Sequence, residues 1–473
     1  MVNYGQPSKN CLPCRRRKLR CDLQAGGCTQ CCRAKLTCHG YRDRNELAFR
    51  DETRTTRQKA VARQASALPR PTAAPQLTWY VQSRNAFLCL YVDGLSCSFD
   101  ALAPLMVESP AGGYLHACVD AASLAFMAFR LNRPDMMVFA NRRYLAAIQS
   151  LGMALRSSEQ PARDDTLQSV LLLDVYEKIA GRHAEGPGSL GSWLSHVQGA
   201  LSMVRSRPST DFSNQTTCQL ASRTAVTLAI SCGVAGVSVP ETLRVLCRDL
   251  DCYVRGVEWA FTSVLVGIVD LRADIRNLTS TSTDILRRAR ELDDKLVLVK
   301  SSMSRSWRSR RVYTAGYDPV VFGGYYDVYP SHHATQVSNA IFMMRLEMSS
   351  IIRTLDPDER CNPYSPASKT ITELTRGICA AIPQFLLPEA RTENAMPFSP
   401  LQLLRCNTML YPLYAAAQLT TDPLMRDWIL QSLARMAENG LKMARDVADM
   451  VTFTPEVDLW AVYAMVGCYA IAA

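Results

Sequence analysis

The chain has 473 residues, of which 48% are hydrophobic and 20% charged, so it is long enough for more than one domain with a sizeable core. Its net charge of +10 is concentrated in residues 1–70, which hold 16 Lys and Arg against 5 Asp and Glu. A basic head on a nearly neutral remainder predicts a polyanionic partner, most plainly nucleic acid. The start, MVNYGQPSKN, lacks the apolar core of a signal peptide, so we do not expect a secreted disulfide protein. The longest apolar run, LWAVYAMVGCYAIAA, has 15 residues and is short for a membrane span, so we expect no membrane partner.

Seven cysteines lie between residues 11 and 38, and six of them repeat one spacing. Three cysteines recur 17 residues later, in the pairs Cys11 and Cys28, Cys14 and Cys31, Cys21 and Cys38. Six thiols can hold one zinc with two thiols to spare, or two zincs that share two thiols. The second arrangement uses every repeated cysteine and predicts two Zn²⁺ ions. In it Cys11 and Cys28 bridge both metals, Cys14 and Cys21 complete one, and Cys31 and Cys38 complete the other.

This segment is too small to build an apolar core. Leu12, Leu19 and Leu36 are nearly all the apolar residues it has. Metal binding must therefore supply most of its folding free energy, on the order of 10 kcal/mol per structural zinc. We expect two short helices, at 13–20 and 30–37, with Leu19 and Leu36 packed inside.

Cys32 lies outside the repeat. It competes with Cys31 as a ligand, but only Cys31 preserves the gaps of two and six residues. The alternative for the whole cluster is a set of unpaired or redox-active thiols, and two copies of one spacing argue against it. The remaining cysteines, scattered from Cys89 to Cys468, lie mostly among apolar residues and predict buried reduced thiols.

The scaffold is duplicated but the charge is not. The first half reads RRRKLR at 15–20, whereas the equivalent stretch of the second half, 32–37, reads CRAKLT. We therefore expect the first half to enter a DNA groove. There guanine offers acceptors to Arg or Lys, and the surrounding basic side chains bind phosphates. The alternative readings of RRRK are a solvated face or a nuclear import signal, and the second is compatible with DNA binding.

The pattern C-LP-C-RRRKLR-C-D…C-TQ-C-CRAKLT-C resembles the DNA-binding domain of the fungal binuclear zinc-cluster transcription factors. The resemblance implies that Arg17 and Lys18 read the bases of a CGG-type triplet in double-stranded DNA. It implies phosphate contacts for Arg15, Arg16, Arg20, Arg33 and Lys35. Many members carry a proline in the loop between the halves, where this chain has DLQAGG, and here we expect the two glycines to supply the turn.

Three regions follow from these patterns: a binuclear zinc-cluster domain at 8–41, a basic linker at 42–76, and an all-helical regulatory domain at 77–473. The linker has apolar residues at Leu47, Val61 and Leu68, but Arg54 interrupts the seven-residue spacing. It is therefore only a candidate for homodimerisation. Its end, LPRPTAAPQ, is typical of a flexible or extended spacer.

Helical periodicity dominates the body. Apolar residues recur at i, i+3 and i+4 in DDTLQSVLLLDVYEKIA, GSWLSHVQGALSMVR and TQVSNAIFMMRLEMSSIIR. We expect a dozen or more helices, with Asp164 or Asp165 capping the first of these segments and Ser192 the second. Loops are expected near 207–216, 313–334 and 355–368. The first two segments also resemble the helical middle region of the same transcription factors, which implies a regulatory body.

The body carries no recognisable catalytic pattern. HExxH and Walker sequences are absent, so we expect no enzyme. We expect His196 to be a hydrogen-bonded core histidine and the methionines of 343–348 to be core residues. His332 and His333 have no cysteine nearby in the sequence, so we expect no second metal site.

Together these observations predict a nuclear transcription regulator that reads CGG-type triplets in the major groove, fold class mainly all-α. From the family alone, a metabolic or secondary-metabolite gene set is the expected target, and a small-molecule inducer or co-regulator is an expected partner. The alternative function is a zinc-dependent interaction scaffold without sequence-specific DNA binding. The charge asymmetry argues against a scaffold, because a scaffold has no need to carry its basic residues in only one half of the cluster.

Overall fold

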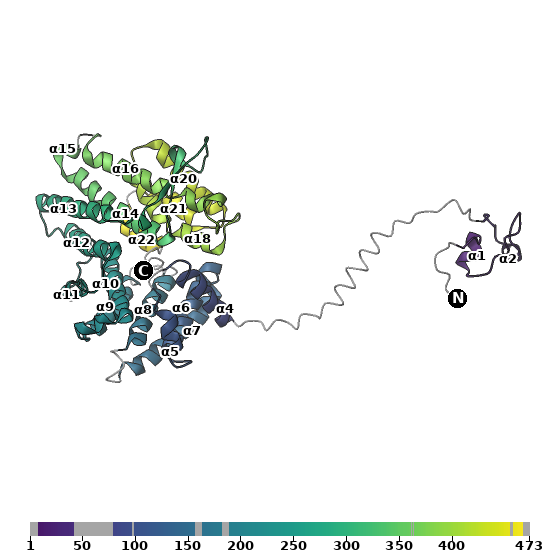
Figure 1. Ribbon diagram of the computed structural model, residues 1–473, viewed down its shortest axis with the longest axis horizontal. Coiled ribbons are helices and arrows are strands. Elements are labelled where there is room, and N and C mark those ends of the chain that lie inside the picture. Colours follow the sequence, from purple (N-terminus) through teal and green to yellow (C-terminus); the bar gives the residue numbers. More distant parts are fainter. Residues whose placement is uncertain are drawn as a thin grey trace. The chain divides into compact units, whose positions relative to one another are not determined.

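The computed structural model describes residues 8–41, 79–96, 99–156, 163–181, 189–360, 362, 364–454 and 457–466. It divides into two compact units, residues 1–76 and 77–473 (Figure 1). The predicted linker and candidate dimerisation segment, 42–76, lies outside the described residues. The fold class is confirmed as mainly all-α.

The described part of the first unit, residues 8–41, contains two short helices, α1 (Leu12–Arg16) and α2 (Thr29–Arg33). Both are shorter than the helices expected at 13–20 and 30–37, because each ends in a left-handed turn. Lys18 and Lys35, which are equivalent in the repeat, both have a φ of 52°. This is the conformation that closes a helix C-terminus and usually belongs to glycine.

Backbone hydrogen bonds complete the same turn in both halves. The Leu19 amide donates to the Cys14 carbonyl at 2.9 Å, and the Leu36 amide donates to the Cys31 carbonyl at 3.0 Å. The turn leaves Leu19 37% exposed and Leu36 45% exposed, so the expectation that they pack inside is wrong. A residue that follows a left-handed position leaves the helical stripe, which the spacing alone could not show.

The second unit is helical through most of its described residues (Figure 1). Its first part runs through α4 (Trp79–Ala86), the π-helical η1 (Phe87–Val92), α5 (Leu102–Glu108), α6 (Tyr114–Leu131), α7 (Pro134–Ala154), α8 (Asp164–Ala180), α9 (Ser189–Arg205), the 3₁₀ turn η4 (Ser209–Ser213), α10 (Gln215–Ala235), α11 (Glu241–Leu250), α12 (Val257–Asn277) and α13 (Ser282–Ser301). Its second part runs through η5 (Arg305–Trp307), β1 (Arg310–Tyr313), η6 (Phe322–Gly324), β2 (Tyr325–Val328), α14 (His332–Leu355), α15 (Pro357–Arg360), α16 (Pro366–Ala380), α17 (Pro383–Leu386), η7 (Pro388–Ala390), α18 (Pro400–Asn407), α19 (Leu410–Leu419), α20 (Pro423–Glu438), α21 (Met443–Phe453) and α22 (Leu459–Val466).

One apolar core extends through the described helices of this unit, from Phe87 to Val466. In Figure 1 the helices up to α8, in blue, gather on one side of the unit, and those from α14 onward, in green and yellow, on the other. Helix α14 packs against α12, α13, α16 and α19. Met343, Met344 and Met348 are at most 6% exposed, which confirms the expected core role of this methionine stripe. A core shared this widely makes α14 the central helix of the second half.

Two predicted helix caps in this unit are wrong. Helix α8 begins at Asp164 itself, and its N-cap is Arg163, so neither aspartate caps it. Asp164 is instead paired with Arg207 at 2.5 Å, and Asp165 with Arg163 at 2.9 Å. Helix α9 begins at Ser189, so Ser192 lies inside it rather than at its start.

The segment expected as a loop at 313–334 contains regular structure. Strand β2 pairs antiparallel with β1, and Arg311 forms an ion pair with Asp327 across the hairpin at 3.0 Å. Ser331 then caps α14, with its hydroxyl accepting from the Ala334 amide at 3.0 Å. The tyrosines and glycines that suggested a loop belong to a short hairpin.

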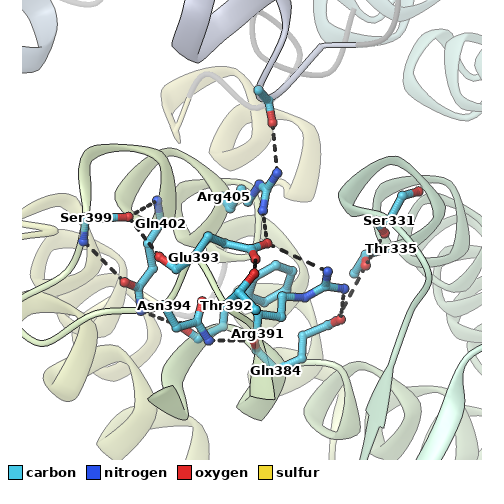
Figure 2. Close-up of polar contacts among 12 residues, drawn as sticks. Ser331, Thr335, Gln384, Arg391, Thr392, Glu393, Asn394, Ser399, Gln402 and Arg405 are labelled. Atoms are coloured by element: carbon cyan, nitrogen blue, oxygen red, sulfur yellow. Dashed lines mark hydrogen bonds and ion pairs between the residues drawn. The ribbon is translucent and has the colours of Figure 1, made fainter. Parts of the chain in front are cut away.

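A polar cluster fixes the connection between α17 and α18 (Figure 2). The Arg391 guanidinium donates to the Tyr329 carbonyl at 2.6 Å and to Gln384 Oε1 at 2.7 Å. Arg405 pairs with Glu393 and donates to the Gly94 carbonyl at 3.2 Å. These contacts join segments that are far apart in the sequence.

Other features bear on the predictions without changing the fold. His196 is a hydrogen-bonded histidine as expected, with its Nε2 2.9 Å from Glu177 Oε1 and 3.3 Å from the Tyr144 hydroxyl. Within the part of the chain that the structure describes, no helix has the length and hydropathy to cross a membrane.

The ion pair between Lys178 and Asp174 generates a stability prediction. Both side chains are at most 2% exposed, their charged atoms lie 2.7 Å apart, and burial lowers the pKa of Lys178 and raises the pKa of Asp174. Lys178→Met leaves a buried carboxylate without its partner and should lower the free energy of unfolding by about 3–5 kcal/mol. Urea unfolding followed by far-UV circular dichroism measures the loss.

The exposed pair between Arg287 and Glu291, with side chains 58% and 52% exposed, supplies the control. Arg287→Met should cost less than about 1 kcal/mol. The double variant Asp174→Leu/Lys178→Met removes both charges and should recover most of the loss. Equal losses for Lys178→Met and Arg287→Met would contradict the prediction.

Candidate metal centre and nucleic-acid interface

Six cysteines of the first unit converge on one point. Their sulfurs form two groups of four that lie within 4.8 Å of one another: Cys11, Cys14, Cys21 and Cys28; and Cys11, Cys28, Cys31 and Cys38. Cys11 and Cys28 belong to both groups. These are the two sets of four that the repeated spacing predicts, and all six are free thiols.

The distances between the sulfurs suit a tetrahedral metal. The Sγ atom of Cys28 lies 3.7 Å from that of Cys11 and 3.5 Å from that of Cys14, and the sulfurs of Cys11 and Cys31 lie 3.6 Å apart. Four sulfurs at a Zn–S distance of about 2.3 Å are separated by about 3.8 Å, which is close to these values. The donor set therefore fits two zinc ions.

Residues 8–41 have almost no interior other than these sulfurs. Cys11, Cys14, Cys21, Cys28 and Cys31 are at most 7% exposed, and Cys38 and Tyr41 pack against them. Leu12, Leu19 and Leu36, by contrast, are all more than a third exposed. Cys32 is exposed and belongs to neither group. Hydrophobic burial therefore contributes little to the stability of the described residues 8–41.

The thiols differ in how readily they ionise. Burial and the neighbouring sulfurs of Cys11 and Cys28 raise the pKa of Cys14 to about 12, and they raise the pKa of Cys31 too. Backbone amides of Cys28 and Gly40 lower the pKa of Cys38 to about 7. A cysteine that binds a metal must be a thiolate. Repulsion between neighbouring thiolates opposes ionisation, and cations placed among the sulfurs would offset this repulsion and lower the pKa values.

Local hydrogen bonds position the second half of the cluster. The Asp22 carboxylate accepts from the Thr29 amide at 3.2 Å at the start of α2, and the Cys28 sulfur accepts from the Cys31 amide at 3.4 Å. The Tyr41 hydroxyl donates to the Gln24 carbonyl. Sequence reasoning missed Asp22 and Tyr41 as supporting residues. An acidic residue seven positions before the start of a helix is too far away to be recognised as its cap from the sequence.

The predicted DNA-contacting side chains lie mainly on the surface of the first half. Arg16, Arg17, Lys18 and Arg20 are exposed and Arg15 is half-buried at the end of α1. In the second half, Arg33 and Lys35 are also exposed. Within residues 8–41 no carboxylate is paired with any of these seven cations. A surface with several unpaired cations in sequence can accept phosphates.

Residues 96–452, most of the second unit, match a family model described as "Fungal specific transcription factor domain". The match does not include the cysteine cluster, which lies outside these residues. No curated protein and no solved structure matches the chain. Because the match spans well over half of the 473 residues, the chain belongs to the family of fungal-specific transcription factors and is a transcription regulator.

Proposed function

We propose that the chain is a nuclear transcription regulator whose first unit binds two zinc ions and reads CGG-type triplets in double-stranded DNA. The observation that carries the proposal is the pair of four-thiol groups sharing Cys11 and Cys28, which form nearly the whole interior of the described residues 8–41. The family to which residues 96–452 belong supports the regulatory part of the proposal.

The zinc ions would serve the first unit as a structural core. Cys11 and Cys28 would contact both ions, and the other four thiols would contact one each. Such a centre supplies folding free energy and no reaction. The exposed arginines and lysines beside the sulfurs would offset the negative charge of six thiolates around two dications.

The basic side chains would then divide the work of DNA recognition. Lys18 lies at the left-handed turn where α1 ends, and Arg17 immediately precedes it. We assign these two to base contacts in the major groove. Arg15, Arg16, Arg20, Arg33 and Lys35 would bind phosphates and set the register.

The metal proposal predicts the zinc content of three proteins. The wild-type chain should contain about two zinc ions, and Cys28→Ser should release both because this sulfur belongs to both groups. Cys32→Ser, the control, should keep about two, since Cys32 is exposed and outside the groups. Elemental analysis of the purified full-length proteins measures the content. A wild-type chain with one zinc, or loss of zinc in Cys32→Ser, would overturn the assignment.

Removal of the metal should affect the two units differently. A strong chelator should abolish DNA binding, because residues 8–41 have little other than the metal to hold them folded. The helical signal in far-UV circular dichroism should hardly change, because the second unit has its own apolar core. A chelator that unfolds the second unit as well would contradict this division.

The DNA proposal predicts different losses at two equivalent lysines. Lys18→Ala should weaken binding to the best site selected from a random pool by about 1–3 kcal/mol, and weaken binding to random DNA less. Lys35→Ala, at the same backbone position of the second half, should weaken both by similar amounts. Fluorescence anisotropy over a range of salt concentrations measures both.

Lys18→Gly distinguishes the contribution of the lysine side chain from that of the backbone conformation. Glycine adopts a φ of 52° without strain, whereas alanine does not. Both variants should lose sequence-specific binding equally if the side chain reads a base. Retained binding in Lys18→Gly would reduce the role of Lys18 to backbone geometry. A random pool that yields no enriched CGG-containing site would favour the interaction scaffold instead.

A further inference from the structure

The second unit contains two neighbouring cavities with a common wall. The larger has a volume of about 790 Å³ and is lined mainly from α10, α12, α14 and the segment before α12. The smaller, about 110 Å³, is lined mainly from α12, α14, α19 and α22. Six residues line both cavities: Ile230, Phe261, Leu265, Gln336, Ala340 and Tyr463. Their combined volume is in the range of sites that bind drug-sized molecules.

The smaller cavity is apolar except at a few places. Its walls include Met343, Met409 and Trp460, together with the shared aromatic residues. Two amide side chains of α14, Gln336 and Asn339, also line it. They are three residues apart, so they lie on one face of the helix.

Both amides have a buried polar atom without a protein partner. Asn339 is 2% exposed, and its Oδ1 accepts no hydrogen bond. Its Nδ2 reaches only the Met409 sulfur, a weak acceptor, at 3.3 Å. The Nε2 atom of Gln336 is buried and has no acceptor. Unsatisfied polar atoms are rare in protein interiors, and these two belong to side chains that line one apolar cavity.

The aromatic wall is fixed in place. The Trp460 indole donates to Glu347 Oε2 at 3.0 Å, and the Arg272 guanidinium lies 5.1 Å from the centre of its ring. On α10, a Cβ atom at Gly233 would come within 2.3 Å of the Trp460 ring, so the absence of a side chain there allows this close approach. A wall held from three sides is typical of a preformed site.

We propose that these cavities bind a drug-sized, largely apolar molecule that carries a hydroxyl group. A hydroxyl both donates and accepts, so it can donate to Asn339 Oδ1 and accept from Gln336 Nε2. The apolar part of the molecule fills the remaining volume among the methionine and aromatic side chains. The inference concerns the second unit alone and does not rest on the proposed DNA binding.

A matched pair of probes tests the hydroxyl. Isothermal titration calorimetry of the full-length chain should show that 2-naphthol binds at least about tenfold more tightly than naphthalene, because a site built around a hydroxyl rejects the analogue that lacks it. Asn339→Leu removes the unpaired oxygen at similar volume. It should abolish this tenfold preference while leaving the binding of naphthalene unchanged or stronger.

Two further variants keep the test independent of folding defects. Gln336→Leu, on the same face, should also reduce the preference for 2-naphthol. Ser338→Ala is the control on the same helix, because the Ser338 hydroxyl is 3.0 Å from the Lys300 ammonium and Ser338 does not line the cavities. It should leave the affinities of both probes unchanged.

Three results would overturn the proposal. One is equal affinity for the two probes in the wild-type chain, which would show that the site does not recognise a hydroxyl group. Another is no binding of either probe, which would leave the cavities as spaces for water. The third is binding that appears only after deletion of residues 467–473, which would make the chain's own end the occupant.

Discussion

The convergence of six thiols is the constraint on which residues 8–41 depend. Their interior is sulfur, because the leucines that could have formed an apolar core are all more than a third exposed. A folded state with so little apolar burial needs another source of free energy, and sulfur–metal bonds are the source that this donor set offers. The basic side chains of the first half are held in place only as firmly as the sulfurs are held together.

Comparison of the two halves separates the residues that the fold of the cluster requires from those available to bind a partner. Both halves have the same helix length, the same left-handed lysine and the same closing hydrogen bond, so these features belong to the scaffold. Arg17 and Arg20 have no basic counterpart in the second half, where Ala34 and Thr37 stand. Because the backbone is the same in both halves, the fold does not require these two arginines.

The sequence predicted what depends on spacing and failed where long-range contacts decide. The grouping of the thiols follows from one 17-residue offset, and the all-α body follows from helical periodicity. The caps expected at Asp164 and Asp165 fail because Arg207 and Arg163 take the two carboxylates as ion-pair partners. The exposure of Leu19 and Leu36 follows from the left-handed lysine that precedes each of them. Lysine rarely adopts this conformation, so the sequence did not indicate it. The cavities could not be predicted, since their walls come from helices more than 200 residues apart in the chain.

The contrast between two sets of side-chain amides in the second unit supports a ligand-binding role for the cavity. In the cluster of Figure 2, Gln384 accepts from the Tyr329 amide and from Arg391 and donates to the Ala381 carbonyl, so both ends of its amide are used. Gln402 likewise accepts from Ser399 and donates to the Phe385 carbonyl. Gln336 and Asn339 lack such partners, and unlike Gln168, whose buried amide is also without a partner, they line a cavity. Unsatisfied polar atoms at the wall of a cavity are expected where function rather than stability has determined the residue.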